Sequence, residues 1–211
     1  MFYNEDNYNF FLKKLKFYIC PIAEIYSYSL LPNHFHLMVK IKSKEAIKLY
    51  YDEEHTKKGI PFRVATEKGN NLIKKDDWGN TDSYQFVHYF ISEQFRRLFV
   101  SYSKALNKQR SRMGSLFCKG FKRKCVDDPL HFTWLVFYIH SNAEKHGLIK
   151  DFKKYQYSSY FPIIDNCTNW ILKDAIFEWF GGKEKYLVFH ESNRPTIDKT
   201  KSLLEDDLLI V

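Results

Sequence analysis

The sequence predicts an α+β fold, and three observations lead to this prediction. Apolar residues recur at helical spacing over residues 4–18 and again over 84–107. Two runs in which apolar and polar residues alternate, 22–31 and 34–41, are typical of strands. The chain has 211 residues, of which 45% are hydrophobic and 18% aromatic, and this is enough to bury the core of one domain with appendages.

The N-terminal elements are predicted to be a helix followed by a hairpin. In the helix over 4–18, the lysines lie outside the apolar stripe. The strand over 22–31 leads into Pro32-Asn33, a dipeptide that signals a turn. The second strand, 34–41, therefore turns back on the first strand and forms a hairpin with it.

The middle of the chain contains the longest predicted loop and the best-defined helix. Residues 42–83 are polar and of mixed charge, so they are predicted to form a long loop with one short helix around 45–51. The helix over 84–107 follows, because its aromatic and aliphatic residues form one stripe. Residues 115–126 are predicted to form a strand in which apolar residues alternate with cations.

The C-terminal part is predicted to be helical. Residues 129–142 form a helix, because Pro129 suits a first helical turn. A last helix over 170–180 is predicted to end at Gly181-Gly182. The tail beyond Asn193 is expected to be poorly ordered for most of its length.

The composition restricts the partners and the cellular compartment. The formal net charge of +8 and the pI of about 9.1 indicate an anionic partner, either nucleic acid or an anionic membrane surface. No run of residues approaches a membrane span and no signal region follows the start, so we expect a soluble, cytoplasmic protein with no membrane partner. The four cysteines form no C-x-x-C pair, which argues against a zinc ribbon and predicts reduced, buried thiols.

Two histidines at the start of the second predicted strand are candidate metal ligands. Successive side chains of a strand point to opposite faces, so His34 and His36 share one face and Phe35 points into the core. Two adjacent imidazoles form half of a divalent-metal site. A pair of ordinary strand histidines is the alternative interpretation of this pattern.

The helix over 129–142 carries a candidate nucleophile and a candidate third ligand. Tyr138 and Asn142 are four residues apart, which places them on one helix face. A phenol can attack phosphorus when a metal polarises the phosphate and a nearby cation favours the phenolate. Two imidazoles and an amide oxygen with open positions suit Mg²⁺ or Mn²⁺. Spacing alone does not distinguish Tyr138 from Tyr102 or Tyr89, since a tyrosine on an amphipathic helix is usually a core residue.

No acidic residue occurs over 94–126, whereas cations and aromatic residues are frequent there. Cations neutralise phosphates and flat rings accept unstacked bases, so this span, called the basic segment below, is predicted to bind nucleic acid. Several of its aromatic residues are also expected in the core. The cations of the basic segment are Arg96, Arg97, Lys104, Lys108, Arg110, Arg112, Lys119, Lys122, Arg123 and Lys124.

Four stretches of the chain together resemble one protein family. Residues 26–39, which contain the His34-Phe35-His36 triplet, resemble the HUH segment of single-tyrosine transposases. Residues 114–124 resemble the segment before the family's basic strand. Residues 138–149 resemble its tyrosine-helix motif, and residues 157–160 resemble a short signature that follows this motif. The order of the four motifs resembles that of the REP-associated tyrosine transposases.

The resemblance implies a ferredoxin-like antiparallel sheet with packed helices. It implies a metal-dependent endonuclease and strand transferase that acts on single-stranded DNA beside a hairpin, as in DNA transposition. It also implies that His34 and His36 bind Mg²⁺ or Mn²⁺ with Asn142 as the third ligand, and that Tyr138 forms a 5′-phosphotyrosine. The basic segment would hold the hairpin stem, and a homodimer is one expected state because such enzymes occur as dimers and as monomers.

The chain departs from the family pattern at its start. Members open with a strand ahead of the first helix, whereas residues 1–4 here already lie at the edge of that helix. The usual first strand is therefore expected to be missing. The expected organisation is a transposase-like domain over 1–160, with an insertion over 42–84, and a C-terminal helical extension over 161–211.

Two other functions fit the same residues. A truncated or domesticated copy would be catalytically inactive and would bind hairpin DNA without cleaving it, and the missing strand favours this alternative. A metal-dependent phosphoesterase would instead use His34 and His36 with water as the nucleophile, and it would release a free 5′-phosphate.

Overall fold

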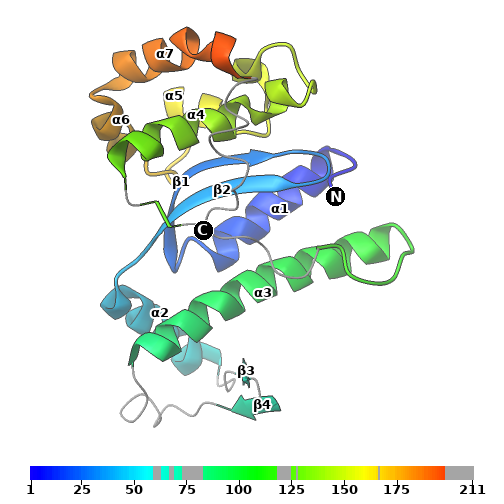
Figure 1. Cartoon of the computed structure of the whole chain (residues 1–211). Helices are drawn as coiled ribbons and strands as arrows, with labels where there is room; N and C mark the ends of the chain where they lie inside the picture. The colour runs from blue at the N-terminus through cyan, green and yellow to red at the C-terminus, as the bar shows by residue number, and fades with distance from the viewer. Residues whose placement is uncertain are drawn as a thin grey trace. The chain divides into compact units, whose positions relative to one another are not determined.

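The structure of the protein is a computed structural model, and it describes residues 1–58, 63–66, 69–72, 83–117, 125–126, 128–165 and 167–197. Its elements follow one another in the order α1 (Glu5–Tyr18), β1 (Ala23–Leu30), β2 (Phe35–Ile41), α2 (Lys44–Lys58), β3 (Arg63–Thr66), β4 (Gly69–Leu72), α3 (Ser83–Gln109), α4 (Pro129–Lys145), the 3₁₀ turn η2 (Phe152–Lys154), α5 (Tyr160–Ile164), α6 (Lys173–Phe180), α7 (Lys183–Ser192) and the 3₁₀ turn η3 (Arg194–Thr196) (Figure 1). The predicted α+β class is confirmed. Within the described ranges, no helix combines the length and the apolar character that crossing a membrane requires.

The chain divides into two compact units. One unit, called the hairpin unit here, comprises Met1–Asn9, Glu24–Lys40 and Cys118–Val211. The other, called the α3 unit, comprises Phe10–Ala23 and Ile41–Phe117. This division differs from the expected boundary after residue 160, because the C-terminal helices belong to the same unit as the hairpin.

The predicted hairpin forms one of the two-stranded sheets of the described residues. Strands β1 and β2 pair in a two-stranded antiparallel sheet, within one residue of the predicted bounds. The turn is closed by the Leu31 N–H, which donates to the His34 carbonyl at 2.8 Å. At the open end, the Lys42 N–H donates to the Ile22 carbonyl at 3.0 Å. The hydrogen bonds at both ends fix the register that places the two histidines at the start of β2.

The second edge of β1 is covered by C-terminal segments. The Leu30 N–H donates to the Tyr157 carbonyl, and the Ser159 N–H donates to the Tyr28 carbonyl, each at 2.9 Å. Further along, Ile171 forms a parallel bridge with Ile25. The residues 1–4 form no strand, but the Phe2 N–H donates to the Pro32 carbonyl at 2.9 Å. Residues from both ends of the chain therefore satisfy backbone groups of the hairpin.

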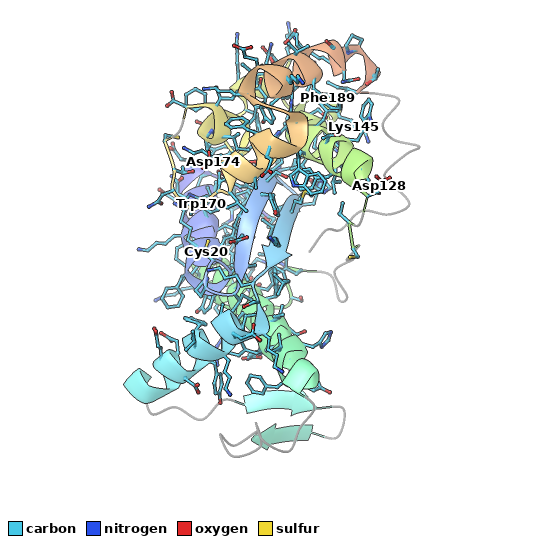
Figure 2. The ribbon with its side chains drawn as sticks, turned by 90° about the vertical axis from the view of Figure 1, so that its left-hand side faces the viewer. Cys20, Asp128, Lys145, Trp170, Asp174 and Phe189 are labelled. Carbon is cyan, nitrogen blue, oxygen red and sulfur yellow. The ribbon has the colours of Figure 1, made fainter. Side chains whose placement is uncertain are left out.

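Helix α4 is the buried centre of the hairpin unit, with α6 and α7 close to it (Figure 1). Its residues from Leu135 to Ala143 are all buried. Phe137 packs edge-to-face against Phe152 and Phe189, with ring centroids 6.0 Å and 6.2 Å apart. Figure 2 labels Phe189 on α7. A helix buried on this many sides is held in place by its neighbours.

The region 42–83 differs from the predicted loop. Helix α2 is twice as long as the predicted short helix, and β3 and β4 form a second antiparallel hairpin. Within the span that was predicted as a short helix, Ile47 and Tyr51 are four residues apart and fully buried. The Tyr51 ring meets the rings of Phe86 and Phe90 on α3 edge-to-face, at 5.0 Å and 5.4 Å. The prediction of a helix over 45–51 is confirmed, and its continuation to Lys58 was not predicted.

Three other predictions need correction. Helix α6 begins at Lys173 rather than at 170, because Ile171 pairs with β1. Helix α7 was not predicted, since its buried residues are an aromatic and a polar side chain rather than an apolar stripe. The thiols of Cys125 and Cys167 are exposed rather than buried. The predicted strand over 115–126 falls largely outside the described residues, and residues 115–117 form no strand.

Candidate metal and tyrosine site

The two histidines of the hairpin lie side by side. His34 directly precedes β2 and His36 is its second residue, and their ring centroids are 5.1 Å apart with the rings nearly perpendicular. The prediction that both rings share one face is confirmed. Phe35, which was expected in the core, is only half-buried, whereas His36 is 7% exposed. The strand therefore turns a histidine, and not the phenylalanine, toward the interior.

Helix α4 brings Tyr138 to this histidine pair. The Tyr138 ring lies 5.5 Å from the His36 ring, centroid to centroid, in an edge-to-face arrangement. Tyr138 is 3% exposed and Asn142 is fully buried. Both lie within the same compact unit as the histidines. The fold thus brings together all four residues that the sequence singled out, from segments about a hundred residues apart.

Four polar atoms at this place are buried without a hydrogen-bond partner. They are both ring nitrogens of His36 and both amide atoms of Asn142. Buried polar groups in folded proteins are almost always hydrogen-bonded, and exceptions concentrate where a ligand, ion or substrate binds. Asn142 lies close enough to both imidazoles to favour their protonated forms slightly, although no pair of atoms reaches hydrogen-bond geometry.

The surroundings keep both imidazoles neutral. Burial lowers the pKa of His36 to about 3, and electrostatic repulsion from His34, His146 and Lys145 acts in the same direction. Burial also lowers the pKa of His34, again with a contribution from His146. Neutral imidazole is the form that binds metal ions. At neutral pH the pair is therefore available as ligands.

Two neighbouring residues, Lys145 and His146, were not predicted as part of the site. The His146 ring lies 5.2 Å from the His34 ring, and the Lys145 ammonium lies 4.7 Å from the centroid of the Tyr138 ring. Lys145, labelled in Figure 2, is the last residue of α4. The helix continues past the predicted end at 142 because Gly147, with φ +67°, supplies the left-handed turn that ends it. Extending the predicted helix by one turn would have placed both residues on the Tyr138 face.

The side chains of His34, His36 and Asn142 fit a divalent cation that accepts both nitrogen and oxygen ligands. Among the residues that the structure describes, no group of three or more His, Cys, Asp or Glu side chains is arranged to hold a metal ion. The candidate ligands are instead two imidazoles and one amide. The atoms of His36 and Asn142 that lack a hydrogen-bond partner include nitrogen and oxygen atoms that can bind a metal ion. Nitrogen and neutral oxygen ligands with open positions are compatible with Mn²⁺ or Mg²⁺.

The basic segment is only partly as predicted. Glu93, one residue before it, is 7% exposed and accepts hydrogen bonds from Arg96 at 2.6 Å and from Arg97 at 3.0 Å. Both cations therefore share one carboxylate within α3, because residues three and four apart share a helix face, and the three side chains keep a net charge of +1. The cations at and beyond the end of α3 point outward: Lys104, Lys108 and Arg110 are exposed and Arg112 is half-buried. Lys119, Lys122, Arg123 and Lys124 lie outside the described residues.

Comparisons of the chain with protein-family models, with curated proteins and with solved structures gave no match. The functional interpretation therefore depends on the residues of the site and on their chemistry.

Proposed function

We propose that the protein is a metal-dependent single-stranded DNA endonuclease and strand transferase that acts through a 5′-phosphotyrosine on Tyr138. One observation carries the proposal: a tyrosine from α4 lies against a histidine pair from the hairpin, with ring centroids 5.5 Å apart. The resemblance to REP-associated tyrosine transposases motivates the choice of DNA beside a hairpin as the substrate. The net charge of +8 supports a polyanionic partner.

The chain's own groups suit attack on a phosphate. Tyr138 supplies the phenol oxygen, and Lys145 places a positive charge 4.7 Å from its ring centroid, next to the position of an incoming anion. His34, His36 and Asn142 would hold the cation, which when bound neutralises the phosphate and makes its phosphorus a better electrophile. Burial of His36 and Asn142 excludes water from this side of the site.

The reaction exchanges one phosphodiester bond for another. The Tyr138 oxygen bonds to the scissile phosphorus while the bond from phosphorus to the 3′ oxygen breaks. The phenol loses its proton to solvent, and the departing 3′ oxygen gains one. The 5′ end remains attached to the tyrosine, and the 3′-OH of a second strand can attack this linkage and release Tyr138. Because each step is a transesterification, joining needs no external energy source.

The proposal is tested by trapping the protein–DNA linkage. A labelled hairpin oligonucleotide with single-stranded flanks should form a covalent adduct in Mn²⁺ or Mg²⁺, visible in a denaturing gel. The Tyr138→Phe variant should lower adduct formation by about 1,000-fold or more while binding is retained. Tyr89→Phe, at a 37% exposed tyrosine of α3, is the matched control and should keep full activity. An adduct that persists in Tyr138→Phe would remove this residue from the role.

A catalytically inactive protein that binds hairpin DNA is the second candidate. Tyr138 is 3% exposed and Asn142 is fully buried, so a phosphate reaches them only if the side chains above them move. Such a protein would show salt-sensitive hairpin binding and no adduct with either metal. Release of a free 5′-phosphate without a protein-linked end would instead indicate water as the nucleophile, on the same histidine pair.

A further inference from the structure

A cluster of buried polar side chains joins three elements of the hairpin unit outside the candidate site. His140 on α4, Ser159 just before α5, and Tyr186 and His190 on α7 are all fully buried. Ser159 also contacts the backbone of Tyr28 on β1. Side chains of this type are rarely buried unless each polar atom has a partner.

The chemistry of one end of this cluster determines the protonation of His190. Burial lowers the pKa of His190 to about 3, so its ring is neutral and carries one proton. Its Nδ1 lies 2.8 Å from the Tyr186 carbonyl oxygen, and a carbonyl oxygen can only accept. The proton is therefore on Nδ1, and Nε2 of His190 is an acceptor.

The same logic continues through His140. Its Nδ1 lies 3.1 Å from the accepting Nε2 of His190, so it must donate. Its other ring nitrogen, Nε2, faces a hydroxyl, which can donate to it. The partner of that nitrogen is the Ser159 hydroxyl, which donates at 2.8 Å. Tyr186 Oη, 3.2 Å from His140 Nδ1, is a second acceptor for the same proton.

The chain of hydrogen bonds ends on the backbone of β1. The Tyr28 N–H donates to Ser159 Oγ at 2.9 Å, and the Tyr28 carbonyl, at 3.2 Å from that oxygen, is a second and longer acceptor for the hydroxyl. Every link from Tyr28 to Tyr186 therefore donates in one direction. This arrangement of protons, which begins at a backbone N–H on β1 and ends at a backbone carbonyl on α7, gives every ring nitrogen of both histidines a partner.

His140 and Tyr138 point to different sides of α4. Two residues along an α-helix correspond to a rotation of about 200°. The hydrogen-bond chain therefore holds one side of the helix to β1 and α7, while the other side presents Tyr138 and Asn142 toward the hairpin histidines. A helix held in this way cannot rotate without breaking a buried hydrogen bond, which is costly in a water-free interior.

We propose that His140 is a positioning residue for Tyr138, and that α7 belongs to the structure that holds Tyr138 against His36. The catalytic consequence depends on the proposed function, whereas the arrangement of protons does not. Residues 183–192 are then required for the site and are not an accessory extension of it.

The first test is independent of activity. Long-range ¹H–¹⁵N correlation spectra of the full chain report which ring nitrogen of each histidine carries the proton. We expect Nδ1 to be protonated and Nε2 to be unprotonated in both His140 and His190. Protonation at Nε2 in either ring would overturn the proposal, because the chain would then be broken at that link.

The second test measures positioning directly. Ser159→Ala removes the donor to His140, and we expect the nuclear Overhauser contacts between the Tyr138 and His36 rings to weaken. Ile163→Ala, at a buried residue of α5, is the control for a general decrease in stability and should leave these contacts intact. Contacts that are equally strong in Ser159→Ala and in the wild type would overturn the positioning role.

The third test separates positioning from folding through single-turnover kinetics. In Ser159→Ala, the rate constant of adduct formation should fall by about 10-fold to 100-fold, and the dissociation constant for the hairpin oligonucleotide should not change. Lower stability alone reduces the amplitude, through the folded fraction, and leaves the rate constant as it is. A rate constant equal to that of the wild type would overturn the proposal. If the wild type forms no adduct, the proposed function fails, and the two spectroscopic tests still decide on the positioning role.

Discussion

At the scale of single residues, the unusual feature is a set of buried polar atoms that the protein itself does not satisfy. His36 and Asn142 keep four such atoms, while His140 and His190, in the same compact unit, have theirs fully paired. Each unsatisfied buried group costs about 1–3 kcal/mol. The hairpin unit thus provides hydrogen-bond partners for His140 and His190, whereas His36 and Asn142 remain available to a ligand.

Replacement of Asn142 by leucine should separate stability from binding. Asn142→Leu removes the unsatisfied amide and keeps the number and branching of the side-chain heavy atoms, so the free energy of unfolding should rise by about 1–3 kcal/mol without metal. The affinity for Mn²⁺, measured by electron paramagnetic resonance, should fall. Ser141→Ala, one residue away and equally buried, serves as the control. A variant that is both less stable and unchanged in Mn²⁺ affinity would contradict the assignment of Asn142 as a ligand.

Acid should destabilise the protein through its buried histidines. Burial lowers the pKa of His190 from 6.5 to about 3, so between these values the unfolded chain binds a proton that the folded protein does not. Stability is therefore complete above pH 6.5 and falls as the pH decreases toward 3, by about 1.4 kcal/mol per pH unit for each such histidine. Urea titrations between pH 7.5 and pH 5 measure this slope. His190→Gln should reduce it, and His88→Gln, at an exposed position on α3, should not.

At the scale of elements, packing on α3 stabilises α2, whose first half was predicted as a short helix. Helix α2 has one buried tyrosine, Tyr51, that meets two phenylalanine rings of α3. Tyr51→Ala should lower the free energy of unfolding by about 3 kcal/mol, because it empties a fully packed position. Leu49→Ala changes a 66% exposed residue of the same helix and should change stability by less than about 0.5 kcal/mol. Equal effects in thermal unfolding would contradict the packing of α2 on α3.

At the scale of the whole molecule, the cations of the basic segment differ in whether they are already paired with a carboxylate. Arg96 and Arg97 both pair with Glu93, although Arg96 is exposed to solvent, as are Lys104 and Lys108, for which no ion pair with Glu93 is seen. Replacing Lys104 or Lys108 by glutamine should reduce the salt dependence of hairpin binding. The slope of the logarithm of the binding constant against the logarithm of the salt concentration should decrease in magnitude by about 0.9 for each phosphate that the variant no longer neutralises. Arg96→Gln should leave this slope unchanged. A larger effect of Arg96 than of Lys108 would show that the ion pair with Glu93 opens on binding.

The elements that the sequence predicts well are those with strong local signals. The predicted bounds of α1, β1, β2 and α3 lie within one or two residues of the observed ones, because period-two and helical patterns are properties of adjacent residues. The shared face of His34 and His36 follows from the same local geometry. Helix α7 was missed, because its buried residues are Tyr186 and His190, and their burial depends on contacts with His140 that no local pattern contains.

The sequence by itself determined the α+β class, the hairpin and the residue types of the site. Only the tertiary structure decided that the Tyr138 ring stands 5.5 Å from the His36 ring, that Lys145 and His146 lie beside them, and that two predicted DNA contacts are paired with Glu93. The physical reason is that side-chain periodicity reports which face of an element is buried, whereas it contains no information on which distant element covers that face. Distances, burial and proton positions at the site arise from that packing.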